Sequence, residues 1–157
     1  MKKIIFLDHD GVLVTSKQYG SRFKKMKKWE RYHPKEPMPL FIQYDSPDFQ
    51  CIDILNEILE ETGADIVVSS DWRNHLDLEQ LGELYNAWGV DSVPLDVTPN
   101  AHNRSAEIMQ FVKECNVEKF VAIDDMYLVC PFFLKTKENQ GLKEKGFKDK
   151  VINILNR

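Results

Sequence analysis

The chain has 157 residues, of which 43% are hydrophobic and 29% charged, and its formal net charge is −4. This is ordinary globular composition, which excludes a low-complexity chain, and no apolar run is long enough to span a bilayer. We expect a single domain over residues 1–157. The apolar run after the N-terminal lysines is too short for a signal peptide, and Cys51, Cys115 and Cys130 are typical of reduced thiols, so we expect a cytoplasmic protein.

The first predicted element is a buried strand from Ile4 to Leu7, which runs into Asp8, Asp10 and Gly11. Four apolar residues stopped by Asp-x-Asp-Gly are typical of a central parallel strand whose carboxyl end opens onto a site. Residues two apart in an extended strand point the same way, so Asp8 and Asp10 can face one small volume if the extended geometry persists to residue 10. Two carboxylates that lie close together need a cation or a shared proton to compensate their repulsion. The alternative interpretation of the motif is a strand end followed by a solvated turn.

The next segment, residues 17–35, is strongly basic. It holds eight lysines and arginines and one acid, so it carries +7 and the rest of the chain −11. A basic segment beside carboxylates indicates an anionic substrate or partner. Tyr19, Phe23 and Met26 share one side of a helical wheel and lysines the other, which predicts a short amphipathic helix. Either its aromatic face packs on the domain and the lysines are solvated, or the segment offers charge and stacking surfaces to a nucleic acid.

The remainder of the chain alternates between helices and strands. We predict helices over residues 46–63, 75–88, 104–115 and 147–155, and strands over residues 64–68, 90–93, 119–123 and 132–134. Ser46 and Pro47 suit the N-cap and the first turn of the first of these helices. The alternation predicts an α/β fold with a mostly parallel sheet covered by helices on both faces.

Polar clusters follow three of the predicted strands. In open parallel sheets the ligand site lies beyond the carboxyl ends of the strands, so we expect these clusters to converge. Carboxylates, hydroxyls and cations together are suited to Mg²⁺-assisted phosphoryl transfer, in which one carboxylate attacks phosphorus and another moves the proton. The clusters are Asp8 and Asp10 after the first strand, Ser69, Ser70 and Arg73 after the second, and Asp124 and Asp125 after the third.

The order of these motifs resembles the haloacid dehalogenase (HAD) superfamily of Mg²⁺-dependent phosphohydrolases. The matching stretches are Phe6–Val12, Ile66–Ser69, Arg104 in place of the third motif's basic residue, and Ile123–Asp125. More narrowly, the letters IVVSSDWR, the helix start at Arg104 and the pair of aspartates look like the phosphatase domains associated with RNA-repair proteins. The resemblance implies a Rossmann-like fold, in which residues 15–45 form a flap or a minimal cap over a fairly open site.

The resemblance also implies roles for the carboxylates. Asp8 would be the nucleophile that forms an aspartyl-phosphate, and Asp10 would be the general acid and base. Asp8, the main-chain carbonyl of Asp10, and Asp124 would hold Mg²⁺, with Asp125 close by as a further metal candidate or as an acceptor behind the ligands. We expect His9 to point away from this site if the strand continues through it.

The phosphate-binding candidates are Ser69, Ser70, Arg73 and Arg104. By resemblance, Ser69 would hold the phosphoryl group, and Arg104 would bridge the phosphate and Asp8 where the family more often has lysine. Each candidate also has a structural alternative. The serines can cap the following helix, Arg73 can belong to a surface ion pair, and Arg104 can lie exposed on a first helical turn.

We therefore expect a Mg²⁺-dependent phosphatase whose substrate is a polynucleotide 3′-phosphate end or a nucleotide, with residues 17–35 contacting the nucleic acid. One alternative is a phosphatase of sugars or other small metabolites. The other is a non-catalytic module that binds nucleic acid or protein on the same fold.

Overall fold

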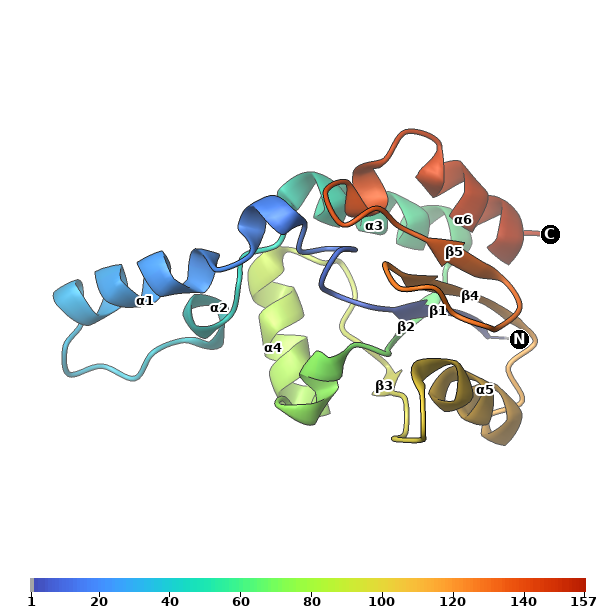
Figure 1. Cartoon of the computed structure of the whole chain (residues 1–157), viewed down its shortest axis with the longest axis horizontal. Coiled ribbons are helices and arrows are strands. Elements are labelled where there is room, and N and C mark those ends of the chain that lie inside the picture. The colour runs from blue at the N-terminus through green and yellow to red at the C-terminus, as the bar shows by residue number, and fades with distance from the viewer. Residues whose placement is uncertain (1) are drawn as a thin grey trace.

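A five-stranded parallel sheet forms the centre of the molecule in the computed structural model, which describes residues 2–157 (Figure 1). Its strands are β1 (Lys3–Leu7), β2 (Asp65–Val68), β3 (Asp96–Val97), β4 (Lys119–Asp124) and β5 (Phe133–Lys135). They lie in the order β3-β2-β1-β4-β5, so the chain changes direction across the sheet between β1 and β4. The predicted α/β fold with a parallel sheet is confirmed, and the switch at β1 and β4 is where such sheets bind ligands.

Helices cover both faces of the sheet. On one face, α3 (Phe49–Thr62), α4 (Leu78–Trp88) and α6 (Phe147–Leu155) bury their apolar sides against β1, β2 and β4. On the other face, α5 (Arg104–Glu114) packs on the opposite side chains of the same strands. None of the helices within residues 2–157 combines the length and the apolar composition needed to cross a membrane.

The structure corrects three predicted boundaries. The helix expected from residue 46 starts at Phe49, because the carboxylate of Asp48 accepts the Gln50 N–H and acts as the N-cap. The helix expected from residue 75 starts at Leu78, behind a capping box formed by Asp77. No strand forms over residues 90–93, because the chain turns there after the left-handed Gly89, and β3 comes later, at residues 96–97.

Residues 16–45, here called the arm, project from the sheet at the end of the molecule away from both termini (Figure 1). The arm contains α1 (Ser21–Tyr32) and the short α2 (Leu40–Gln43), of which only α1 was predicted. No residue of α1 is buried, and the Phe23 side chain is 63% exposed. The predicted amphipathic helix therefore exists, but the expectation that its aromatic face packs on the domain is wrong for Phe23.

The base of the arm is held by a buried carboxylate. Asp45 accepts hydrogen bonds from the Gly20 and Arg22 N–H groups at 2.9 and 3.1 Å, and from Nη1 of Arg22 at 3.1 Å. Beside it, Oγ of Ser21 accepts the N–H of Ser46 at 2.9 Å. These contacts join the start of α1 to the chain after α2, so the arm leaves and rejoins the body at one place.

Candidate active site

The ends of three strands bring polar side chains into one row. In the sheet register, Leu7 pairs with the last residue of β2 and with the next-to-last residue of β4. The residues that follow these three therefore lie side by side across the sheet. They are Asp8 after β1, Ser69 after β2, and Asp124 at the end of β4. All three are buried, and their register places them on the face that α5 covers. The convergence predicted from the sequence is confirmed for these residues.

Three carboxylates gather at this row and form the acidic cluster: Asp8, Asp124 and Asp125, with oxygen atoms within 4.8 Å of one another. Arg104, the first residue of α5, lies against them. Its Nη1 is 2.8 Å from Oδ2 of Asp124 and 3.5 Å from Oδ2 of Asp8. The sequence-predicted residue Arg104 thus contacts Asp8, and it is not exposed on its first turn.

The electrostatics of the acidic cluster favour an added cation. Burial, together with the charge of Asp124, holds the pKa of Asp8 well above its usual range, although Arg104 opposes this. Burial also raises the pKa of Asp125. One guanidinium faces three carboxylates, and their hard oxygen donors are the ligands that Mg²⁺ prefers. The donor set therefore fits the divalent ion that the sequence predicts.

Gly11 makes room for Asp125. Its φ of +78° lies in the left-handed region, and a Cβ atom at this position would lie 2.5 Å from Oδ2 of Asp125. A side chain at residue 11 would therefore displace this carboxylate. The glycine of the Asp-x-Asp-Gly motif fixes the turn after β1 and also admits one member of the acidic cluster.

Of the two serines after β2, Ser69 has the free hydroxyl. Its Oγ is buried and has no hydrogen-bond partner within residues 2–157. A buried hydroxyl without a partner is costly, so a ligand oxygen is the natural acceptor for it. Ser70 instead accepts the N–H of Trp72 at 3.2 Å and caps the turn at Asp71–Asn74, as in the structural alternative.

The N–H donors of Arg73 are paired within the protein. An arginine has five N–H donors, and those of Arg73 are used by the carbonyls of Ser69, Ser70 and Thr98 and by the side chains of Asn100 and Glu107. Nη2 lies 2.5 Å from the Glu107 carboxylate, and the Arg73 side chain is 3% exposed. In the structure Arg73 is a buried connection between the loop after β2, the loop after β3 and α5, and its contact with a substrate stays a prediction.

Asp10 lies beyond the end of β1, on the turn that follows Asp8. Its carboxylate accepts the indole N–H of Trp72 at 3.1 Å and lines a hollow of about 290 Å³ next to Arg22 and Asp45. Burial raises the pKa of Asp10, although the hydrogen bond from Trp72 opposes this. The extended geometry does not persist to residue 10, because the strand ends at Leu7 and the chain turns, so strand alternation does not set the direction of this side chain. No backbone N–H described by the structure donates to the carbonyl of Asp10, which was the predicted metal ligand.

His9 points to the opposite face, as expected. It is fully buried beneath α4, and its Nε2 lies 2.6 Å from the hydroxyl of Tyr85. Burial lowers its pKa to about 3, so the imidazole is neutral. His9 is therefore part of the core beneath the site.

One family model matches residues 4–147, and its description is the HAD domain in Swiss Army Knife RNA repair proteins. The match spans the acidic cluster, Ser69, Arg104 and the arm. The chain belongs to this HAD family. Searches of curated proteins and of solved structures found no match. The five-stranded parallel sheet is consistent with the Rossmann-like fold of HAD domains.

Three residues of this HAD domain escaped sequence reasoning. Trp72 contacts Asp10 across 62 positions of sequence, and Asp71 lies 3.0 Å from Nη2 of Arg104. Thr98 follows β3 in the same row as Ser69, and its buried hydroxyl also lacks a partner in the described chain. The sequence carries no local signal for these contacts, because each depends on a loop's path after its strand has ended.

Proposed function

We propose that the protein is a Mg²⁺-dependent phosphohydrolase that acts through an aspartyl-phosphate on Asp8, with polynucleotide 3′-phosphate ends or nucleotides as substrates. The row of Asp8, Ser69 and Asp124 at the sheet switch carries the proposal. It sets a nucleophile, an unpartnered hydroxyl donor and a cation-binding carboxylate side by side on three strands. HAD domains are typically phosphohydrolases, which agrees with this chemistry.

In the first step, a carboxylate oxygen of Asp8 attacks phosphorus, and the bond from phosphorus to the leaving oxygen breaks. Asp10 gives its proton to that oxygen, which leaves as an alcohol. Ser69 donates its free hydroxyl to a phosphoryl oxygen, and Arg104 adds positive charge beside Asp8. The raised pKa of Asp10 supports its part as the acid.

In the second step, Asp10 takes a proton from a water molecule as that water attacks phosphorus. The bond between phosphorus and Asp8 then breaks, and inorganic phosphate leaves. Trp72 holds one oxygen of the Asp10 carboxylate, so the other oxygen is left for the proton. One side chain therefore serves both steps by giving a proton and then recovering one.

Asp8, Asp124 and the carbonyl of Asp10 would hold the Mg²⁺, with Asp125 beside them. When bound, the ion supplies positive charge to the phosphoryl oxygens and lets the carboxylates stay ionised next to one another. The basic arm and the RNA-repair description of the family support a polynucleotide as the substrate.

The test is a substrate panel with Mg²⁺, comprising 3′-phosphorylated oligonucleotides, nucleoside monophosphates and sugar phosphates. We expect the oligonucleotides to have the highest kcat/KM, whereas a preference for sugar phosphates would reject the nucleic-acid part. Asp8→Asn should lose nearly all turnover, and Asp53→Asn, an exposed aspartate on α3, serves as the matched control. A binding module would instead show no turnover in either form.

A further inference from the structure

We infer that one face of α1 is a track for the single strand that carries the scissile phosphate, with its terminal base against Phe23. This inference rests on the proposed function. The track is defined as Tyr19, Phe23, Lys24, Met26 and Lys27. The leaving group of the substrate would lie along these residues, on one half of the basic helix.

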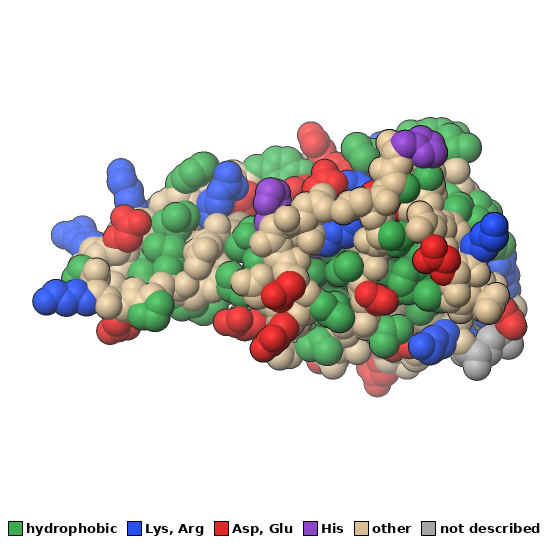
Figure 2. Space-filling model, turned by 90° about the horizontal axis from the view of Figure 1, so that it is seen from below, with side chains coloured by type: hydrophobic (Ala, Val, Ile, Leu, Met, Phe, Trp, Pro, Cys, Tyr) green, Lys and Arg blue, Asp and Glu red, His purple; other side chains and the backbone are tan. Residues whose placement is uncertain are grey.

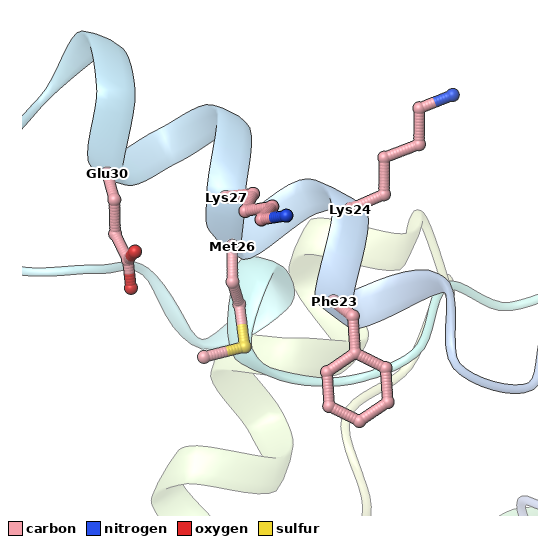
Figure 3. Close-up of a pocket in the computed structure, with 5 residues that line it drawn as sticks. All are labelled: Phe23, Lys24, Met26, Lys27 and Glu30. Carbon is pink, nitrogen blue, oxygen red and sulfur yellow. The ribbon is translucent and has the colours of Figure 1, made fainter.

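Two adjoining hollows connect Asp10 to this face of α1. The first, of about 560 Å³, is lined by Asp10, Tyr19, Gly20, Arg22, Phe23 and Asp45. The second, of about 540 Å³, is lined by Phe23, Lys24, Met26, Lys27 and Glu30 (Figure 3). Phe23 lines both, so the two hollows adjoin at this side chain.

The direction of the strand follows from the chemistry at Asp10. The acid must lie beside the oxygen that leaves, so the leaving group occupies the Asp10 side of the phosphate. In a polynucleotide monoester, that leaving group is the sugar of the terminal nucleotide and the strand behind it. We therefore place the entry of the strand in the hollow of about 560 Å³, which lies beside Asp10 and adjoins the hollow on α1.

The side chains of the track suit a nucleotide strand. Phe23 is 63% exposed and Tyr19 is 42% exposed, and bases of any sequence stack on such rings. In Figure 3, Phe23 and Met26 extend to the same side of the helix, while Lys24 reaches outward. The Cζ atom of Arg22, whose guanidinium is paired with Asp45, lies 4.4 Å from the centroid of the Phe23 ring and covers one part of it.

The track carries two lysines that are unpaired in the described part of the chain. Lys24 and Lys27 are exposed and form no ion pair within residues 2–157, so they are free to neutralise phosphates. Figure 2 shows lysine and arginine side chains around the narrow end that the arm forms. Glu30 also lines the second hollow. Its negative charge would repel a phosphate, so the strand would leave the helix before this residue.

The decisive comparison uses two double variants with the same loss of charge. Lys24→Ala with Lys27→Ala removes the lysines of the track, whereas Lys28→Ala with Arg31→Ala removes two exposed cations outside it. With 3′-phosphorylated single strands of increasing length, we expect the first variant to raise KM at least tenfold for long strands and to leave a nucleoside 3′-monophosphate unaffected. For this variant, the slope of log affinity against log salt concentration should become shallower by about 1.4, because each phosphate contact with a single strand contributes about 0.7 to the slope.

Phe23→Ala tests the base contact. It should raise KM for nucleotide substrates and leave kcat/KM unchanged for an abasic sugar 3′-phosphate. Equal effects of the two double variants would mean a diffuse electrostatic attraction and would overturn the track, as would an unchanged KM in Phe23→Ala. Thermal unfolding checks that each variant is folded.

The proposed function can fail separately. If the wild-type protein hydrolyses no phosphate ester, fluorescence anisotropy with a 3′-hydroxyl oligonucleotide still compares the two double variants. If the protein hydrolyses small phosphates but binds no oligonucleotide, the phosphatase stands and the track is rejected, which would leave this face to a protein partner.

Discussion

Three carboxylates share one arginine at the ends of β1 and β4, and this imbalance has a measurable cost. Burial and the neighbouring Asp124 disfavour the charge on Asp8, so the folded protein stores electrostatic repulsion when no cation is bound. A bound cation would relieve this repulsion, and oxygen ligands of this kind suit a small divalent ion.

Mg²⁺ should therefore stabilise the fold. At a concentration 100 times the Kd, we expect about 2.7 kcal/mol of added stability and a rise in Tm of about 5–10 °C. Asp8→Asn removes one buried charge, so its Tm should exceed that of the wild type in EDTA and should respond little to Mg²⁺. Differential scanning fluorimetry with and without the ion measures both effects, and Asp53→Asn is the control. A Mg²⁺ response that survives in Asp8→Asn would argue against a site at this cluster.

His9 should set part of the acid sensitivity of the fold. Its pKa is about 3 when folded and near 6.5 when unfolded, so between these values only the unfolded chain takes up the proton. The free energy of unfolding should then fall by up to about 1.4 kcal/mol for each unit as pH decreases from 6.5. His9→Gln should flatten this slope in urea titrations, whereas His75→Gln, at an exposed histidine, should keep it. Parallel slopes in all three proteins would contradict this assignment.

At the scale of elements, the turn after β1 arranges the site. Gly11→Ala would force a left-handed alanine and push against Asp125. Gly20→Ala is the matched control, because its φ is +81° and its nearest neighbour atom lies 3.7 Å away. Both should lose about 1–2 kcal/mol from the backbone alone. Only Gly11→Ala should also weaken Mg²⁺ binding in calorimetric titrations, and equal affinities in the two variants would show that Asp125 does not depend on this glycine.

Much of this element-level arrangement is dictated by local sequence. The strands before Asp8, Ser69 and Asp124 are apolar runs that stop at polar residues, and parallel pairing alone brings their ends together. The path of the chain beyond each strand is harder to predict. Asp10 turns toward Trp72, and Arg73 turns back onto the carbonyls of its own loop, because these directions depend on contacts with distant segments. Arg104 was predictable because a helix start fixes its position.

At the scale of the whole molecule, the arm is separable from the sheet that carries the acidic cluster. Replacing residues 21–43 with a short flexible linker should preserve the fold, since Gly20 and Asp45 already touch. We expect a loss of about 2–4 kcal/mol, from the partly buried Leu40 and from the hydrogen bonds of Arg22 and Ser21 at the base of the arm. The Mg²⁺-dependent rise in Tm should remain, and the preference for oligonucleotides over nucleoside monophosphates should disappear. A shortened protein without cooperative unfolding would show that the arm is needed for folding.

Because no residue of α1 is buried, its sequence can change during evolution without a large effect on folding. Substitutions on an exposed helix usually alter stability by less than about 0.5 kcal/mol, so this helix can vary with little penalty in folding. Asp45 keeps its point of attachment constant while the helix surface drifts. Under the proposed function, substrate preference would diversify on the arm while the reacting groups stay fixed on the sheet. A laboratory library confined to α1 would then yield variants with altered substrate preference.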